Sequence, residues 1–254
     1  MTVTSRFSQG LQSGDWQKGL DLSKIKCDFV IAKATEGINY LDPCFHDFMR
    51  QAEALGKCMG FYHFARPELN DAKKEAKFFY ANTNRFFNKA IPILDWESAG
   101  RHNVAWAKEW LDEIYALTGV RPVLYSSESF INQYDWSMVA NSNYGLWVAK
   151  YRDREIDLNY DMTCAGKNPV VKWWKFYCMW QWTSKGRLDG YAKDLDCDVF
   201  YGSREAWGKY AGAGRTYVVQ EGDTLSSIAE AVGISVDDLA EKNNLISVGQ
   251  VLRF

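Results

Sequence analysis

The sequence lacks any continuous apolar run of roughly 18 residues, the length that a membrane-spanning helix needs, so we expect no membrane insertion. It also lacks a basic run. Its 30 Lys and Arg against 32 Asp and Glu give a net charge of −2, which favours no nucleic-acid partner. The first residues, MTVTSRFSQG, lack the charged and apolar segments of a secretory signal peptide.

Metal-binding patterns are missing as well. The chain has only 3 His, scattered along its length, and its 6 Cys show no CxxC spacing. The cysteines are Cys27, Cys44, Cys58, Cys164, Cys178 and Cys197. We therefore expect no metal site and no cofactor. Without a visible signal peptide, we expect the cysteines to be reduced and structural.

Tryptophan, by contrast, is abundant, and the chain contains 11 residues of this type. One interpretation is a tryptophan-rich core. The other is a set of flat platforms that stack on sugar rings. All of the tryptophans precede residue 211, where the composition changes to the small and flexible stretch AGAGR. We therefore predict a large domain over 1–210, a linker over 211–214 and a small domain over 215–254.

The large domain contains eight segments with the apolar pattern of strands. They cover 7–11, 29–35, 59–65, 90–97, 122–127, 146–151, 178–183 and 195–200. Helical patterns separate the early segments, at about 43–55, 71–87 and 103–117. The alternation predicts parallel pairing, and eight strands predict an α/β fold, a modified β/α barrel. The later connections are too short or irregular for full helices, so the helix set should be incomplete.

The small domain has the pattern strand–helix–helix–strand. Short strands are expected at 217–220 and 251–254. Asp223 can cap the first helix, which Gly233 would end. Ser235 and Asp238 fit a capping box that opens the second helix. This pattern predicts a small βααβ module.

Two carboxylates end the fourth predicted strand, in the stretch AIPILDWES (90–98). Because side chains alternate along a strand, Asp95 and Glu97 should share one face while Trp96 points to the other. Parallel barrels carry their active sites at the carboxyl ends of the strands. Two close carboxylates repel, so one should keep its proton to higher pH, as glycoside hydrolysis requires. On this stretch alone, a pair of solvated strand-end acids remains the simpler interpretation.

Other predicted strands carry further polar and aromatic residues. They are Tyr62, His63, Tyr125, Ser126, Trp147, Trp180, Gln181 and Asp196. Each alone can be a packing residue, and a histidine such as His63 is more often part of a core. Together, a ring of tyrosine, tryptophan and carboxylate around one mouth indicates a polysaccharide substrate.

Seven motifs follow one another along the large domain. They are DFVIAKATEG (28–37), GFYHFARP (60–67), ILDWE (93–97), TGVRPVLYSS (118–127), LWVAKY (146–151), WQWTSKG (180–186) and LDCDVF (195–200). In order and spacing they resemble the glycoside hydrolase family 25 lysozymes, the Chalaropsis-type muramidases, over about 7–205. The resemblance implies a barrel with fewer than eight helices. It also implies cleavage of the β-1,4 bond between N-acetylmuramic acid and N-acetylglucosamine in peptidoglycan.

The resemblance further implies roles for the matching residues. Glu97 would be the general acid, and Asp95 would stabilise the oxazolinium or oxocarbenium ion that develops as the 2-acetamido group assists. Asp196 would be a further catalytic acid. Substrate would contact Gln12, Lys33, Glu36, Tyr62, His63, Tyr125, Trp147 and Trp180. Whether the reaction retains or inverts configuration is left open.

One position departs from the family pattern. The first strand of the family reads approximately G-[IV]-D-V-S-x-x-Q, whereas the matching stretch here reads GLQSGDWQ (10–17). Gln12 therefore stands where an Asp is expected, and it keeps hydrogen bonding but loses the charge. Either the enzyme works without that Asp, or Asp15 replaces it, or activity is reduced. A substitution made to trap substrate is a further alternative, although Asn would be the nearer mimic.

The small domain resembles a LysM module along its length, from YVVQEGDTLSSIAEAVG (217–233) to GQVL (249–252). Such modules bind glycans that contain N-acetylglucosamine. The resemblance implies glycan contacts by Gly222, Asp223, Thr224, Leu225, Asn244, Leu245 and Ile246.

We therefore expect a monomeric muramidase anchored to peptidoglycan glycan strands, most simply a phage endolysin. Such an enzyme waits in the host bacterial cytoplasm and then acts at the cell wall. A wall-binding protein whose barrel has lost catalysis is an alternative that only Gln12 favours. A chitin hydrolase is a second alternative, suggested by the preference of LysM for N-acetylglucosamine.

Overall fold

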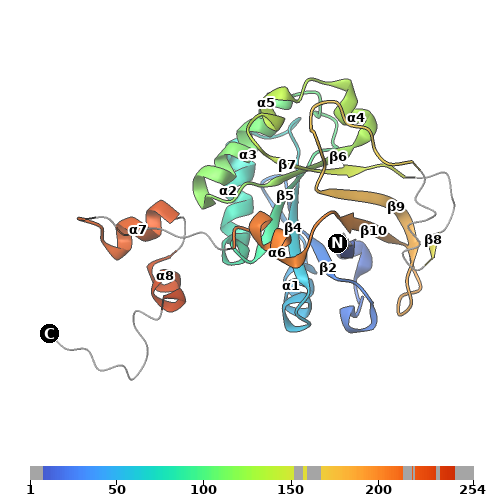
Figure 1. Cartoon of the computed structure of the whole chain (residues 1–254), viewed down its shortest axis with the longest axis horizontal. Helices are drawn as coiled ribbons and strands as arrows, with labels where there is room; N and C mark the ends of the chain where they lie inside the picture. The colour runs from blue at the N-terminus through green and yellow to red at the C-terminus, as the bar shows by residue number, and fades with distance from the viewer. Residues whose placement is uncertain are drawn as a thin grey trace, which may run out of the picture.

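A computed structural model describes residues 8–151, 157–158, 167–213, 219, 221–232 and 235–243 (Figure 1). The strands are β1 (Ser8–Ser13), β2 (Phe29–Glu36), β3 (Tyr40–Leu41), β4 (Cys58–Phe64), β5 (Ala90–Asp95), β6 (Val123–Ser127), β7 (Gly145–Ala149), β8 (Asp157–Leu158), β9 (Met179–Arg187) and β10 (Leu195–Phe200). The helices are α1 (Phe45–Ala54), α2 (Ala72–Thr83), α3 (Val104–Thr118), α4 (Glu128–Gln133), α5 (Ser137–Ala140), α6 (Arg204–Tyr210), α7 (Leu225–Val232) and α8 (Val236–Lys242). Short 3-10 turns lie at Asp15–Gln17, Leu22–Lys24 and Asn84–Phe86.

The strands close into a barrel. Their order is β1-β10-β9-β7-β6-β5-β4-β2, and pairing of β1 with β2 completes the ring. The predicted eight-stranded barrel is thus confirmed, but its strands are not all parallel. β10 runs antiparallel to both β9 and β1. The connection over 188–194 between β9 and β10 is too short for the crossover that parallel neighbours require.

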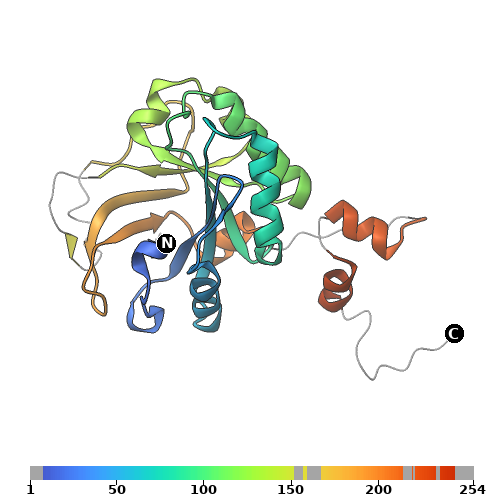
Figure 2. The ribbon, with the colours of Figure 1, turned by 180° about the vertical axis from the view of Figure 1, so that it is seen from behind.

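The outer layer differs between the two sides of the barrel. Figure 2 shows the long helices after the early strands on one side and the hairpin of β9 and β10, in orange, on the other. The later strands have only the short α4 and α5 together with an irregular segment before β9, in which Trp173 and Trp174 pack against the outer core. The predicted incomplete helix set is confirmed.

Helix ends follow local capping chemistry. The Asn103 side chain accepts a hydrogen bond from the backbone N–H of Trp106 and starts α3, and Gly119, at φ 64°, ends it. The first helix begins at Phe45, two residues later than Pro43 suggested. The reason is that the Asp42 carboxylate accepts the N–H of Cys44 and so forms a turn ahead of the helix.

The core has an inner layer inside the barrel and an outer layer under the helices. Side chains such as Ile31, Ile93 and Phe200 fill the inside, and Trp207 of α6 closes its amino-terminal end by donating its indole N–H to the Met59 carbonyl. Six tryptophans are less than 2% exposed: Trp96, Trp110, Trp136, Trp147, Trp180 and Trp182. For these six, the core interpretation holds.

The described part of the small domain consists of α7 and α8, which contact each other. The Thr224 hydroxyl, rather than Asp223, accepts the N–H of Ser227 at the start of α7. Ser235 accepts the N–H of Asp238 at the start of α8, as the predicted capping box requires. Apart from Val219, the strands expected at 217–220 and 251–254 lie outside the described residues.

Two further findings concern the described residues only. None of their helices is long and apolar enough to cross a membrane. The five cysteines among them form no disulfide: Cys27, Cys44, Cys58, Cys178 and Cys197. Cys164 lies outside the described residues.

Candidate active site

The candidate site lies at the barrel end where the parallel strands finish. β10 contributes its first residues there, because it runs in the opposite direction. Its Asp196 is paired in register with Gln12, near the carboxyl end of β1. The antiparallel strand therefore delivers its acid to the same mouth as the parallel ones.

Asp95 and Glu97 stand at the end of β5. Asp95 is the last strand residue and is 3% exposed, whereas Glu97 follows the strand and is exposed. Trp96 is completely buried on the opposite side and donates its indole N–H to the Arg101 carbonyl. The alternation expected from the sequence is thus present, and one acid lies deep while the other faces solvent.

Burial and mutual repulsion keep this pair of carboxyls partly protonated. Burial raises the pKa of Asp95 well above its usual range, and the charge of Glu97 raises it further while Lys33 opposes the rise. Among the described residues, no hydrogen-bond partner reaches the buried Oδ1 of Asp95. Although part of the Glu97 side chain is exposed, the protein around its carboxyl removes water from it and so also raises its pKa, against the opposing charges of Arg101 and Lys33. The pair can therefore keep a proton on one carboxyl to higher pH than an isolated acid while the other carries a negative charge.

Two more acids lie on β10. Burial, followed by the charges of Glu97 and Asp194, raises the pKa of Asp196 to about 7. The sequence reasoning missed Asp198, which is fully buried and accepts the indole N–H of Trp147 at 3.0 Å. Burial raises its pKa well above the usual range, and Asp196 adds to the rise. The sequence did contain a signal for Asp198: it lies two residues after Asp196 on the same strand, and residues two apart on a strand share a face.

An uncharged hydrogen-bond network connects the other strands of the mouth. Its centre is Gln181, whose side-chain oxygen accepts the hydroxyls of Tyr125 at 2.6 Å and Tyr151 at 2.7 Å. The Gln181 amide donates to the Gln12 side-chain oxygen at 2.8 Å, and Gln12 in turn bonds Tyr62. Sequence reasoning counted Gln181 among the strand residues of the mouth but gave it no substrate contact, and it did not name Tyr151.

A pocket of about 280 Å³ opens next to this network. Glu97, Tyr125 and Tyr151 line it, together with Ser127, Glu128, Ser129, Ala149 and Lys150. The exposed acid of the pair therefore faces a cavity that a small sugar unit can enter.

Ion pairs form part of the rim of the mouth. Lys33 Nζ lies 2.6 Å from one oxygen of Glu36, and the Arg66 guanidinium lies 2.5 Å from the other. Although burial works against it, these two cations hold the pKa of Glu36 below its usual value. Lys33 thus pairs with the rim carboxylate of Glu36, and its positive charge also partly offsets the rise in the pKa values of Asp95 and Glu97.

Three predicted substrate contacts are corrected by their positions. His63 is completely buried in the outer layer, where it bonds Thr35 at 2.8 Å and Glu75 at 2.7 Å, because it alternates with the inward-facing Tyr62. Trp180 also belongs to the outer core, since Gln181 takes the inward direction. Trp147 points inward but is 1% exposed, beneath the mouth rather than along a groove.

The predicted glycan-binding residues of the small domain are only partly described. Gly222, at φ 90°, Asp223 and Thr224 precede α7, and Leu225 is its first residue. Thr224 and Leu225 are exposed. Asn244, Leu245 and Ile246 lie outside the described residues.

Comparisons with known proteins agree with this architecture. The model of the family "Glycosyl hydrolases family 25" matches residues 8–191, and the model of the LysM domain matches 217–254. The chain is 28% identical to Lysozyme M1 of Streptomyces globisporus over 218 residues, covering 77% of this chain and 68% of that protein. It is 28% identical to the lysozyme of Streptococcus phage Cp-1 over 157 residues, covering 58% of this chain and 43% of that protein.

A solved structure shares the fold. The bacterial lysozyme from Streptomyces coelicolor superposes with a TM-score of 0.68 and 24% identity, covering 80% of this chain and 96% of that chain. At this identity the likeness concerns the fold.

Proposed function

The chain belongs to glycosyl hydrolase family 25 and is a glycoside hydrolase, and from this premise we propose that it is a peptidoglycan muramidase. Its substrate bond would be the β-1,4 bond between N-acetylmuramic acid and N-acetylglucosamine. The observation that carries the proposal is the acid pair at the end of β5, where burial raises the pKa values of both Asp95 and Glu97. A glycosidase needs such a proton at neutral pH to protonate its leaving group.

The different exposure of Glu97 and Asp95 suggests a different catalytic role for each acid. Glu97 is exposed and lines the pocket, so it would protonate the glycosidic oxygen as the bond to the anomeric carbon breaks. Asp95, deeper in the barrel, would stabilise the positive charge that spreads over the sugar and its assisting 2-acetamido group. For this role Asp95 must be ionised, so the developing positive charge would lower its raised pKa and leave the shared proton on Glu97. Water would then add to the anomeric carbon and give its proton to the Glu97 carboxylate. Asp196 would support the same charge from β10.

The other mouth residues would hold the sugar. Tyr62 and Tyr125 carry hydroxyls at the floor of the mouth, and Lys33 and Glu36 lie at its rim. Tyr151 is 49% exposed beside the Glu97 pocket and offers an aromatic face to a sugar ring. Trp147 would act from below by fixing Asp198.

The small domain would tether the barrel to its substrate. We propose a barrel domain over 1–210, a linker over 211–214 and a LysM domain over 215–254 whose glycan groove includes Gly222–Leu225. Tethering raises the effective concentration of substrate without adding a catalytic contact. The phage relative supports the further proposal that the protein is an endolysin, monomeric, released from the host cytoplasm and acting at the wall.

Mass spectrometry of digested peptidoglycan tests the bond specificity. A muramidase leaves N-acetylmuramic acid at the reducing ends of its products. Reducing-end N-acetylglucosamine, or no product at all, would contradict the proposal. Digestion of chitin in parallel separates a chitin hydrolase, which should act on chitin more rapidly than on peptidoglycan.

Gln12 favours a second candidate function, a wall-binding protein with a weakened barrel. The position carries no charge and forms part of the neutral network with Gln181. On this candidate, the unaltered protein should bind walls but show a hydrolysis rate near zero. A turbidity assay on purified walls distinguishes the two candidates.

A further inference from the structure

A second pocket, of about 600 Å³, lies at the other end of the barrel from the acid pair. Arg121 lines it just before β6, Phe176 lines it just before β9, and Gly145 is the first residue of β7. These are the amino-terminal ends of strands whose carboxyl ends form the mouth. The pocket is therefore separate from the candidate active site.

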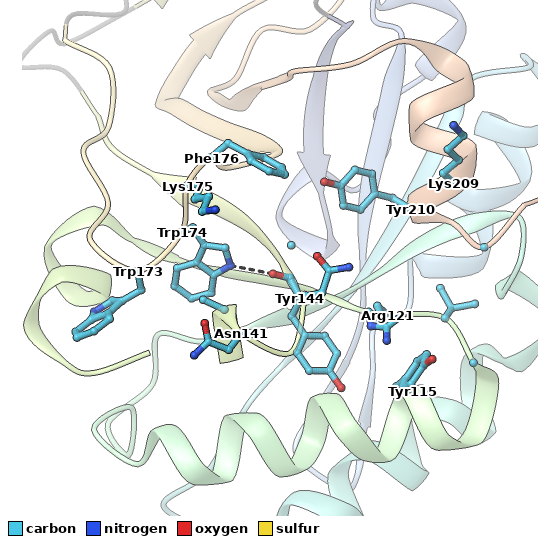
Figure 3. Close-up of a pocket in the computed structure, with 16 residues that line it drawn as sticks. Tyr115, Arg121, Asn141, Tyr144, Trp173, Trp174, Lys175, Phe176, Lys209 and Tyr210 are labelled. Atoms are coloured by element: carbon cyan, nitrogen blue, oxygen red, sulfur yellow. Dashed lines mark hydrogen bonds between the residues drawn. The ribbon is translucent and has the colours of Figure 1, made fainter. Parts of the chain in front are cut away.

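Aromatic rings form much of its lining. Figure 3 shows Trp173 and Trp174 on one side of the pocket and Tyr115 on the other. The indole N–H of Trp174 donates to the Tyr144 carbonyl at 2.8 Å, so the ring is held in place. Phe176 is 68% exposed, although it is large and apolar. Fixed, accessible aromatic faces of this kind suit the apolar faces of sugar rings.

The charges in the lining have one sign. Arg121, Lys175 and Lys209 line the pocket, which has no acidic lining residue among those described. None of the three forms an ion pair with another residue in the described part of the chain. The Arg121 guanidinium lies 4.3 Å from the Tyr115 ring centroid, a cation–π contact that orients it and leaves its N–H donors available.

We propose that this pocket binds an acidic glycan, a chain of sugar rings that carries phosphate or carboxylate groups. Aromatic faces next to cations that have no ion-pair partner among the described residues fit such a chain, whereas a neutral sugar or an apolar peptide would bring no negative charge to these cations. The pocket also borders the end of the barrel sequence: Lys209 and Gly212 line it, and the LysM match begins shortly after, at residue 217. That the glycan is a cell-wall polymer rests on the proposed function.

The test uses the full-length chain with Glu97→Gln, so that walls stay intact during binding. In this background, Lys175→Ala/Lys209→Ala should weaken binding to purified walls about tenfold and reduce its dependence on salt. The matched control is Lys26→Ala/Lys74→Ala, which removes two exposed lysines that are outside the pocket lining. Phe176→Ser should weaken binding too, since it removes an exposed ring without opening the core.

Two wall preparations distinguish the sources of negative charge. Walls stripped of phosphodiester-linked polymers retain the carboxylates of peptidoglycan. If phosphate is the ligand, the deficit of the double variant disappears on stripped walls; if carboxylate is the ligand, the deficit persists. Either result supports the pocket.

Equal binding of the double variant and its control to both preparations would overturn the proposal. Equal binding together with a lowered unfolding temperature would assign the pocket to another segment of this chain and would overturn it as well. The proposed muramidase activity is judged separately, from the digestion products of the unaltered protein.

Discussion

The side-chain amide of Gln181 donates a hydrogen bond to the side-chain oxygen of Gln12 across 2.8 Å. This contact links β1 to β9 at the floor of the mouth, although β10 lies between these two strands in the sheet. Gln12 also bonds Tyr62, and because its side-chain oxygen already accepts from Gln181, its amide group is available to donate to the Tyr62 hydroxyl. A carboxylate at position 12 would accept from both neighbours and bring a negative charge next to the acid of its register partner, Asp196.

Gln12→Asp should therefore shift the pH–rate profile to higher pH. A new negative charge raises the pKa values of nearby acids, so the general acid would keep its proton to a higher pH and the alkaline limb would shift in that direction. Rates on purified walls between pH 4 and 9 measure this, with the neutral Gln12→Asn as control. A profile that does not move would contradict the electrostatic argument. A large gain from a rate near zero would support the weakened-barrel candidate.

Glu97→Gln should lower the hydrolysis rate by about a thousandfold or more, because the amide cannot protonate the leaving oxygen. Binding to walls should stay within about twofold, since the small domain is unaltered. Released reducing ends and sedimentation with walls measure the two quantities. Glu109→Gln, an exposed position on α3, is the matched control and should retain full activity. Turnover that survives in Glu97→Gln would remove Glu97 from the role of general acid.

The eight barrel strands were predictable because most are short apolar runs between polar breaks, and helix ends such as Gly119 have a strong local signal. The two-residue strands β3 and β8 have no such run and were not predicted. The direction of β10 was not predictable, since the periodicity of a strand is the same for parallel and antiparallel pairing. Its only signal was the short connection after β9. The start of α1 was misjudged because the Asp42 carboxylate bonds Cys44 in a turn, a choice that depends on local geometry.

The site was predictable where family motifs and alternation agree, as in the same-face pair Asp95 and Glu97. Alternation applied to every strand would also have corrected two assignments. Tyr62 and His63 cannot both point inward, nor can Trp180 and Gln181. Which member faces the mouth depends on the register of the whole barrel, which a single segment does not reveal.

The contribution of Asp196 to stability should fall as pH rises from about 4 to about 7. The pKa of Asp196 is about 7 in the folded protein, against about 3.9 for an unfolded Asp, so the folded state binds more protons in this window. The raised pKa values of Asp95 and Asp198 act with the same sign. Midpoints of urea unfolding across pH 4 to 7 measure the slope. Asp196→Asn should flatten it, whereas Asn at the exposed Asp189 should not, and an unchanged slope in Asp196→Asn would contradict the assignment.

Glu75→Ala should destabilise the protein by about 3 kcal/mol, because the Glu75 carboxylate accepts hydrogen bonds from three partners. They are His63 Nε2 at 2.7 Å, the backbone N–H of Arg66 at 3.0 Å and the Asn70 amide at 2.7 Å. Urea unfolding measures the loss, and Glu53→Ala, which removes only an exposed pair with Lys89, should cost under about 1 kcal/mol. Since His63 is a core residue on this account, the KM for peptidoglycan fragments should not change well below the unfolding temperature. A small loss of stability with a raised KM would return His63 to the substrate-binding residues.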